Sequence, residues 1–376
     1  MTDTSHKKQR DIRWFRIHSW IGLKLSILMT FVLVTGTFAV VSADIDWLLA
    51  PEMRTLPAYD GPVAWGAAYD AANREFPAAS VISLERSTDA WFATQALIRS
   101  PWEQMGRAWM DPASGDYQGF TRWMNVQRFF RMTHRHLMLP TPIGIPIVTI
   151  LAVPLFLSLV AGLVIYKGFW RGLFKWPRFG RNTRIWAGDL HRLMGLWSSW
   201  LLILIVITSL WYLAELLGAR APAFPKGEMT ALEEPMITLS GSDIDGAVIE
   251  AERLLPGLKV RRIVLPSERD QRLTVTGDLS AALVRPRANA VVFDPRTLTV
   301  LAHYRGEEAS LHTRISEAAD PLHFGYFGGW WTKSLWFVVG AALSGLSITG
   351  CVIYGKRALR KASRAAPQTY LGATQA

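Results

Sequence analysis

Cysteine is nearly absent from this chain, because its 376 residues include only Cys351. A single cysteine excludes an intrachain disulfide framework, a cysteine-based zinc site and a thiolate-bound iron–sulfur cluster. The sequence also lacks a P-loop, a GxGxxG motif after an expected strand, an HExxH motif and a recognisable Ser/His/Asp arrangement. No nucleotide or hydrolytic site is therefore visible, and a redox role would need a cofactor held by other ligands.

Charged residues are scarce in four long apolar runs, each of which can cross a hydrocarbon layer of about 30 Å as a helix. The first run shows no convincing cleavage site, so we interpret it as a retained signal anchor. The expected spans are residues 21–43, 143–166, 193–217 and 335–354.

Acidic residues are scarce in three segments that carry much of the net charge of +11. Asp3, Asp11 and Asp189 stand there against many basic residues, namely Lys7, Lys8, Arg10, Arg13, Arg16, Lys167, Arg171, Lys175, Arg178, Arg181, Arg184, Lys356, Arg357, Arg360, Lys361 and Arg364. The positive-inside rule places these segments, and both termini, in the cytoplasm. This charge is expected to face a lipid bilayer and does not indicate nucleic-acid binding.

The spans divide the chain into a membrane part and two outer modules. We expect a four-helix transmembrane bundle, all-α in the membrane, with two periplasmic α+β modules and an internal duplication. Besides the spans, the expected segments are a cytoplasmic tail (1–20), a first outer module (44–140), a basic cytoplasmic loop (167–192), a second outer module (218–332) and a cytoplasmic tail (355–376).

The two halves of the chain repeat one pattern of span, outer module and span. Segment 72–77 matches 251–256, and the Gly162–Tyr166 motif matches Gly350–Tyr354. Both copies run in the same sense, which predicts a pseudo-twofold axis along the membrane normal. Equivalent residues close to that axis should then face each other.

Four histidines lie at matching ends of the four spans: His18, His134, His191 and His323. A haem with two histidine ligands needs two neutral imidazoles on opposite faces of its ring. We therefore predict two b-type haems, one held by His18 and His191 near the cytoplasmic face and one by His134 and His323 near the outer face. His136 is an alternative to His134.

Other residues beside these histidines are expected to contact the haems. Gly22 and Gly195 each follow a histidine by one helical turn, where a larger side chain would collide with a flat ring. The propionates need polar or cationic partners, for which Arg16, Arg192 and Arg135 are the nearest candidates. A single histidine at a membrane end is more often an interfacial side chain. The prediction therefore depends on the repetition.

With these motifs the chain resembles the PepSY-associated transmembrane helix family over nearly its whole length. Within that family it is most similar to the FoxB-type ferric-siderophore reductases of the bacterial inner membrane. The resemblance implies PepSY-like outer modules, two haems on such histidines and reduction of siderophore-bound iron in the periplasm. The matching pieces are Arg16–Gly22, His134–Leu137, Asp189–Gly195, His323–Gly325 and Ser347–Gly350.

The resulting hypothesis is an inner-membrane oxidoreductase, a ferric-siderophore reductase that releases Fe(II). Its electrons would come from the cytoplasmic or inner-leaflet side, from an unidentified donor such as a quinol or a cytoplasmic flavin reductase. The partner would be a ferric siderophore, with the hydroxamate type one option. Two alternatives stay open: a haem conduit for another periplasmic acceptor, and a non-redox PepSY membrane protein that binds or regulates a periplasmic partner.

Overall fold

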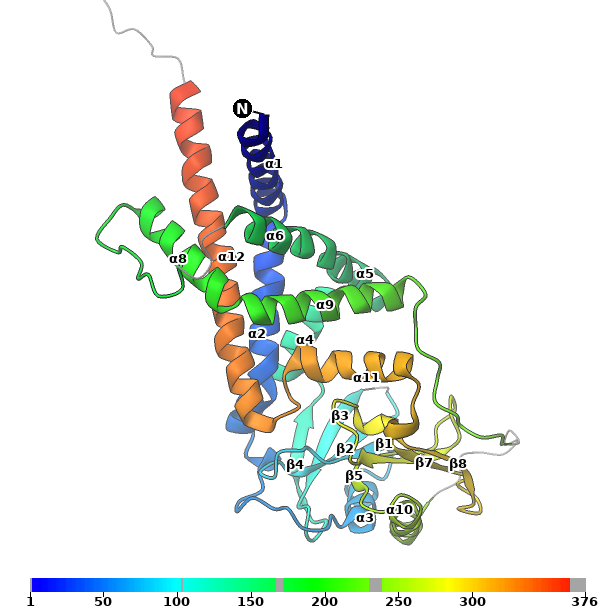
Figure 1. Cartoon of the computed structure of the whole chain (residues 1–376). Coiled ribbons are helices and arrows are strands. Elements are labelled where there is room, and N and C mark those ends of the chain that lie inside the picture. The colour runs from blue at the N-terminus through cyan, green and yellow to red at the C-terminus, as the bar shows by residue number, and fades with distance from the viewer. Residues whose placement is uncertain (1, 103, 167–171, 230–238, 366–376) are drawn as a thin grey trace, which may run out of the picture. The chain divides into compact units, whose positions relative to one another are not determined.

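The computed structural model describes residues 2–102, 104–166, 172–229 and 239–365, which form two compact units. Unit 1 contains residues 1–37, 134–210 and 337–376, and unit 2 contains residues 38–133 and 211–336. Unit 1 is helical, whereas all eight strands named below belong to unit 2 (Figure 1). Nothing in the fold of either unit depends on a disulfide, because Cys351 is free.

Among the described residues four helices are long and apolar enough to cross a membrane, which confirms the expected number of spans. The helices that build unit 1 include one of these four entirely, whereas residues 38–49, 211–216 and 329–336 of the other three fall in unit 2. The candidate spans are Ser26–Leu49, Thr141–Ile165, Ser199–Leu216 and Gly329–Lys356. The helices are α1 (Thr2–Lys24), α2 (Ser26–Leu49), α5 (Thr141–Ile150), α6 (Ala152–Ile165), α8 (Thr183–Trp197), α9 (Ser199–Leu216) and α12 (Gly329–Ala365).

Two of these spans begin after a break that the hydropathy pattern did not indicate. The first expected span started at residue 21, but α1 ends at Lys24 and α2 begins at Ser26. The third was expected from residue 193, but α8 ends at Trp197 and α9 begins at Ser199. The breaks lie at Lys24–Ser26 and at Ser198–Ser199. Apolar residues flank both, so a hydropathy average over about twenty residues does not locate them.

Helices α2 and α12 pack side by side in unit 1 through small polar residues. The hydroxyl groups of Thr30 and Ser347 are 2.6 Å apart, and those of Thr37 and Ser344 are 3.2 Å apart. A Cβ atom at Gly340 would lie 2.9 Å from Oγ1 of Thr37, so only glycine permits this approach. Small residues and hydroxyl pairs are typical contacts between membrane helices, which have no hydrophobic effect to hold them together.

Unit 2 contains one continuous antiparallel sheet in the order β4-β3-β2-β1-β5-β6-β7-β8. The strands are β1 (Ser80–Glu85), β2 (Thr94–Arg99), β3 (Met105–Met110), β4 (Tyr117–Arg122), β5 (Lys259–Val264), β6 (Leu273–Asp278), β7 (Ala290–Phe293) and β8 (Val300–Tyr304). Its other elements are η1 (Pro51–Met53), η2 (Pro286–Ala288), η3 (Gly306–Glu308), α3 (Trp65–Glu75), α4 (Val126–His136, which runs into unit 1), α10 (Gly241–Leu254) and α11 (Leu311–Phe324).

The two expected outer modules share this sheet instead of folding as separate bodies. Each half consists of a helix followed by four strands, α3 with β1–β4 and α10 with β5–β8. The halves join where β1 pairs with β5, with Leu84 opposite Ile263. Both side chains are fully buried in one core that draws on both halves.

This junction has the symmetry that an internal duplication predicts. The match of segment 72–77 to 251–256 makes Leu84 equivalent to Ile263. These two residues are direct partners in the sheet. Equivalent residues meet each other only near a twofold axis, so a local pseudo-twofold axis runs through the centre of unit 2.

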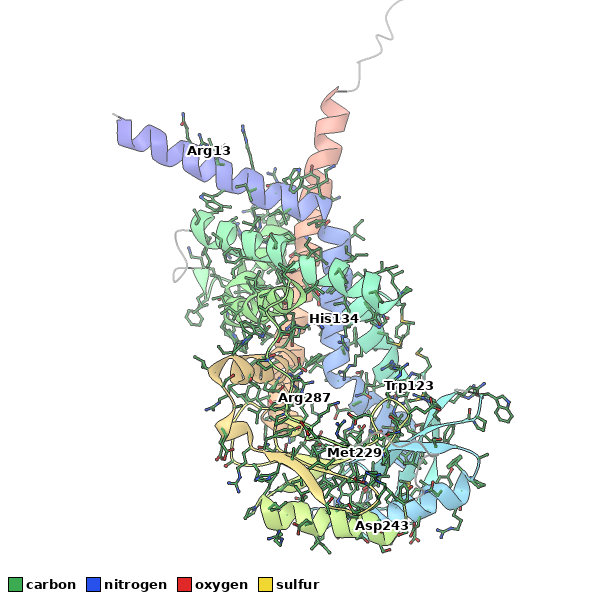
Figure 2. The ribbon with its side chains drawn as sticks, turned by 90° about the vertical axis from the view of Figure 1, so that its right-hand side faces the viewer. Arg13, Trp123, His134, Met229, Asp243 and Arg287 are labelled. Carbon is green, nitrogen blue, oxygen red and sulfur yellow. The ribbon has the colours of Figure 1, made fainter. Side chains whose placement is uncertain are left out.

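Helices α3 and α10 cover one side of the sheet together, and α11 lies on the other side (Figures 1 and 2). The backbone N–H of Gly241 in α10 donates to Asp70 of α3 at 2.8 Å, and that of Gly66 in α3 donates to Asp245 of α10 at 2.8 Å. A Cβ atom on either glycine would come within 2.6 Å of the other glycine's carbonyl oxygen. These glycines let the two helices contact each other with their main chains.

We predict that Ile263→Ala destabilises the protein by about 3 kcal/mol, because it empties a site where both halves share their core. Ile249 in α10 is the matched control, since it is 68% exposed whereas Ile263 is 0% exposed. Ile249→Ala should change stability by no more than about 0.5 kcal/mol. Thermal unfolding of the purified protein in detergent, followed by circular dichroism, measures both; equal shifts would contradict a shared core at this position.

Candidate functional site

The rings of His18 and His191 lie next to each other inside unit 1. His18 is on α1, seven residues before the break at Leu25, and His191 is on α8, seven residues before the break at Ser198. Their ring centroids are 6.3 Å apart, and their planes meet at 76°. Of the four predicted histidines, this pair is the one that the structure brings together within a single unit.

Main-chain carbonyl groups orient both rings in the same way. Nδ1 of His18 is 3.2 Å from the carbonyl oxygen of Ser158, and Nδ1 of His191 is 2.9 Å from that of Leu346. Thr349 adds its hydroxyl group at 3.2 Å from Nδ1 of His191. A carbonyl acceptor favours the tautomer with its proton on Nδ1, so that Nε2 carries the free lone pair.

A glycine follows each of these carbonyl groups by one helical turn, but only the one beside His191 is close to a histidine ring, because around Gly162 a Cβ atom would meet no other atom within 4 Å. The accepting residue stands four positions before a glycine in each case: Ser158 before Gly162, and Leu346 before Gly350. In a helix the side chain of a residue covers the preceding turn, so a glycine uncovers the carbonyl group there. The contact is close at His191, where a Cβ atom on Gly350 would lie 3.3 Å from Cε1.

The surroundings of both histidines favour the neutral form of the imidazole. Burial lowers the pKa of His18. Burial, followed by the charge of the neighbouring His18, lowers the pKa of His191 to about 4. Neutral imidazoles with a fixed tautomer are the form that ligates a metal, because a protonated ring has no lone pair to donate.

A cavity of about 460 Å³ opens beside the two rings in unit 1. It is mostly apolar, and its walls include both histidines and the two predicted glycines, Gly22 and Gly195. Around Gly22 a Cβ atom would meet no other atom within 4 Å, whereas at Gly195 it would touch Leu346 at 3.4 Å. The volume falls in the range of roughly 300–1,000 Å³ that is typical of ligand and cofactor sites.

Arg192 is the one predicted arginine that lines this cavity among the described residues. It contacts Asp189 at 3.4 Å and donates to the carbonyl oxygen of Lys175 at 3.2 Å. Its Nε is buried and has no hydrogen-bond partner in the described part of the chain, so it can still bind an anionic group. Arg16 and Arg135 are exposed and do not line the cavity.

His134, labelled in Figure 2, also contacts a main-chain carbonyl group that lies one turn before a glycine, here on helix α2. Its Nδ1 is 2.9 Å from the carbonyl oxygen of Val32 in α2, four residues before Gly36. A Cβ atom on Gly36 would lie 2.6 Å from Cε1 of His134. Burial also lowers the pKa of His134.

His136 differs from His134, because its Nδ1 donates to the nearby carbonyl oxygen of Leu139 at 2.7 Å. This bond ties the ring to the end of its own helix. His134, in contrast, reaches a neighbouring helix in the manner of His18 and His191. The environment of His134 is therefore the one that resembles the other predicted ligand sites.

His323 lies near the end of α11 in unit 2, in aromatic surroundings. Its ring packs edge-on against Tyr212 at 5.4 Å and Phe324 at 5.6 Å. The Tyr212 hydroxyl group donates to Asp320 at 2.8 Å, one turn before His323. His134 and His323 belong to different units, so their pairing stays a prediction.

Sequence reasoning missed the residues that orient the imidazoles, above all Gly36 and Ser158. Gly162 and Gly350 were visible as repeat-equivalent residues, but their four-residue offset from an accepting carbonyl group was not. That signal needs knowledge of which helix packs against which histidine. No cluster of three or more His, Cys, Asp or Glu is placed to hold a bare metal ion in the described residues.

Comparison with known proteins finds a family and a relative whose sequences are similar to this chain. The family model described as "PepSY-associated TM region" matches residues 15–357. The chain is also 28% identical over 233 residues to the uncharacterized protein PA4219 of Pseudomonas aeruginosa. That alignment covers 57% of each chain, so this sequence spans little more than half the length of that relative.

We predict that Gly36→Ala destabilises the protein by about 1–3 kcal/mol, because the new methyl group would displace the His134 ring from a packed site. Gly355→Ala is the matched control, since it lies in helix α12 with no other atom within 4 Å of its Cβ position. There the gain in helix propensity should stabilise by up to about 1 kcal/mol. Thermal unfolding should thus give shifts of opposite sign; stabilisation by both substitutions would show that His134 does not pack on Gly36.

Proposed function

We propose that this chain, which belongs to the PepSY-associated TM region family, is a membrane electron-transfer protein that holds two b-type haems and reduces ferric siderophores. The comparisons identify a membrane protein of that family, and its relative carries no functional description. The finer statement rests on the geometry of His18 and His191. With this proposal the chain would be a member of the FoxB type that its sequence resembles.

The distance between the two imidazoles is the observation that carries the proposal. A bond of about 2.0 Å from metal to nitrogen, and about 1.1 Å from that nitrogen to the ring centre, put two imidazoles on one iron about 6 Å apart. The observed centroid separation is 6.3 Å.

The surroundings of the pair also fit a haem. Each Nδ1 faces a carbonyl oxygen, which orients the ring and raises the basicity of Nε2 as a ligand. The cavity beside the rings is apolar and has open space over Gly22. Arg192 offers a buried, unpartnered Nε to a propionate at its edge. When bound, a haem would supply reversible one-electron chemistry at a potential set by these ligands and by burial.

For the outer haem we propose His134 and His323 as ligands, with His134 preferred to His136. The support for His134 is its carbonyl anchor over Gly36, which matches the other two sites. Arg16 and Arg135 do not line the cavity of unit 1, and we keep them as candidates for contacts with haem propionates. The two outer-haem ligands would complete an electron path from the cytoplasmic side to the periplasm.

Reduction of a ferric chelate suits a protein without a general base or a nucleophile. Hard oxygen donors bind Fe(III) more strongly than Fe(II), so the gain of one electron loosens the metal from its chelator. Outer-sphere transfer requires only a close approach of the chelate. The protein's own residues would bind the chelate, exclude water from the haems and keep the axial imidazoles neutral.

We predict that the purified protein shows a Soret band and holds two haems per chain. His18→Ala or His191→Ala should lower this content to one, because each removes an axial ligand of the same haem. His134→Ala should remove the other haem, whereas His136→Ala should keep both. Pyridine haemochrome assays with quantitative amino-acid analysis give the ratio of haem to chain for each variant.

His303→Ala is the control for loss of a histidine alone, since His303 is exposed on β8 of unit 2. It should leave haem content and unfolding temperature unchanged. Protein that folds and lacks a Soret band after expression with sufficient haem would favour the non-redox alternative. Loss of both haems from His18→Ala would argue against two separable sites.

We also predict that ferric chelates oxidise the dithionite-reduced protein in a saturable reaction that yields one Fe(II) for each electron released. Stopped-flow absorbance at the reduced haem band, with ferrozine to trap Fe(II), follows both products. Protein that holds haem but transfers no electron to any ferric chelate would instead be a conduit for another periplasmic acceptor.

A further inference from the structure

Unit 2 contains a second cavity, of about 410 Å³, whose wall includes none of the four predicted histidines. It lies between the segment 220–226, which follows α9, and the end of the sheet formed by β6, β7 and β8. Helix α11 closes one side with Thr313, Ser316 and Glu317. Every residue of its wall belongs to the same unit.

Cations outnumber carboxylates on the wall of this cavity. Arg220, Lys226, Arg285 and Arg287 line it, against Glu215 and Glu317. Lys226 is paired with Asp270 at 2.6 Å, whereas Arg220 makes no ion pair within the described residues. Because Lys226 and Arg285 are already paired with carboxylates, Arg220 and the exposed part of Arg287 are the cationic groups that an anionic ligand would meet.

One buried carboxylate holds two of the guanidinium groups in place. The Glu317 side chain is only 3% exposed and accepts from Arg285 at 2.8 Å and from Arg287 at 2.9 Å. Arg285 also donates to Asp320 at 2.7 Å, so its bonding capacity is largely used. Arg287, labelled in Figure 2, keeps 59% of its side chain exposed and can bind a further oxygen ligand.

An aromatic pair forms another part of the wall. The rings of Phe224 and Tyr304 are stacked, with centroids 4.7 Å apart and planes only 4° apart. Burial raises the pKa of Tyr304 to about 12, so its hydroxyl group stays protonated and can donate to an oxygen atom. Arginine and aromatic faces together suit a ligand that has both negative oxygens and flat rings.

We infer that this cavity binds an anionic tris-catecholate metal chelate, whose aromatic rings would pack near Phe224 and Tyr304 while its oxygens meet Arg220 and Arg287. The inference rests on the proposed function for the identity of the metal as iron. It narrows the substrate from ferric siderophores in general to catecholates, whose complexes with trivalent ions are trianions.

A chain of contacts connects this cavity with His323. Arg285 of the wall binds Asp320, Asp320 accepts from the Tyr212 hydroxyl group, and the Tyr212 ring packs on His323. Burial and the neighbouring carboxylate of Asp320 also raise the pKa of Tyr326. A chelate in the cavity would therefore sit against the same network that holds the proposed outer ligand.

The test measures binding of a gallium(III) tris-catecholate, because gallium has the charge and size of Fe(III) but accepts no electron under these conditions. The full-length protein should bind it saturably in microscale thermophoresis. Arg220→Gln and Arg287→Gln should each weaken binding about tenfold, the effect of one charged hydrogen bond. Arg314→Gln is the matched control, since Arg314 is exposed on α11 and does not line the cavity.

Two further measurements test the aromatic contacts and the charge contacts separately. Phe224→Ala should weaken binding of the catecholate complex but not of gallium(III) citrate, which is anionic and has no aromatic ring. Gallium(III) desferrioxamine, which lacks the negative charge, should bind at least tenfold more weakly than the tris-catecholate. Equal binding of the desferrioxamine and tris-catecholate complexes, or equal binding by wild type and Arg220→Gln, would overturn the inference.

The outcome is independent of whether the protein contains haem. Gallium binding that depends on Arg220 and Arg287, in protein without a Soret band, would support the cavity and remove the proposed electron transfer. Haem-containing protein whose gallium binding ignores these arginines would leave the electron transfer and eliminate this site.

Discussion

The orientation of three imidazoles depends on one interaction, a hydrogen bond from Nδ1 to a main-chain carbonyl oxygen on a neighbouring helix. Such carbonyl groups are normally occupied within their own helix and covered by the side chain four residues later. Glycine at that position makes room for the ring at Val32 and at Leu346, whereas the glycine that follows Ser158 has open space around it. The same hydrogen bond sets the tautomer of the imidazole and holds the ring in place. It therefore determines both the position and the basicity of the histidine.

Internal duplication appears as direct contact between equivalent residues. His18 and His191 face each other within unit 1, and Leu84 pairs with Ile263 within unit 2. A sheet formed by two equivalent halves gains a core that neither half could enclose alone, since α3 and α10 pack over the junction. In unit 1 the same kind of duplication brings two histidines from distant parts of the sequence to one cavity. The duplication thus produces both the shared sheet and the pair of adjacent histidines.

Charge has different roles in the two cavities. In unit 1 a single arginine, Arg192, faces an apolar space beside neutral histidines. In unit 2 the buried Glu317 holds Arg285 and Arg287 at the wall of an open, polar cavity. A low-dielectric wall favours a neutral, flat cofactor with few charged groups. A wall of fixed guanidinium groups favours a ligand that brings negative charge from solvent.

The local patterns in the sequence were sufficient for the number of spans and for the approach of His18 to His191. Hydropathy over about twenty residues indicates membrane helices, and matching His-x-x-x-Gly segments indicate repeat-equivalent histidines, because both signals are local. The breaks at Leu25 and Ser198 were not visible, since apolar residues flank both and dominate an average over about twenty residues. The arginines could be named only by proximity in sequence, and of the three only Arg192 reaches the cavity.

By itself, then, the sequence determined which residue types are available and how often they recur. The tertiary structure alone decided that the two expected modules share one sheet, that glycines on α2 and α12 make room for histidine rings at carbonyl groups, and that segment 220–226 meets β8 and α11. Each of these depends on contacts between residues more than 75 positions apart, or on the direction in which a helix face points. Such contacts are selected by the packing of whole elements, and no short stretch of sequence encodes them.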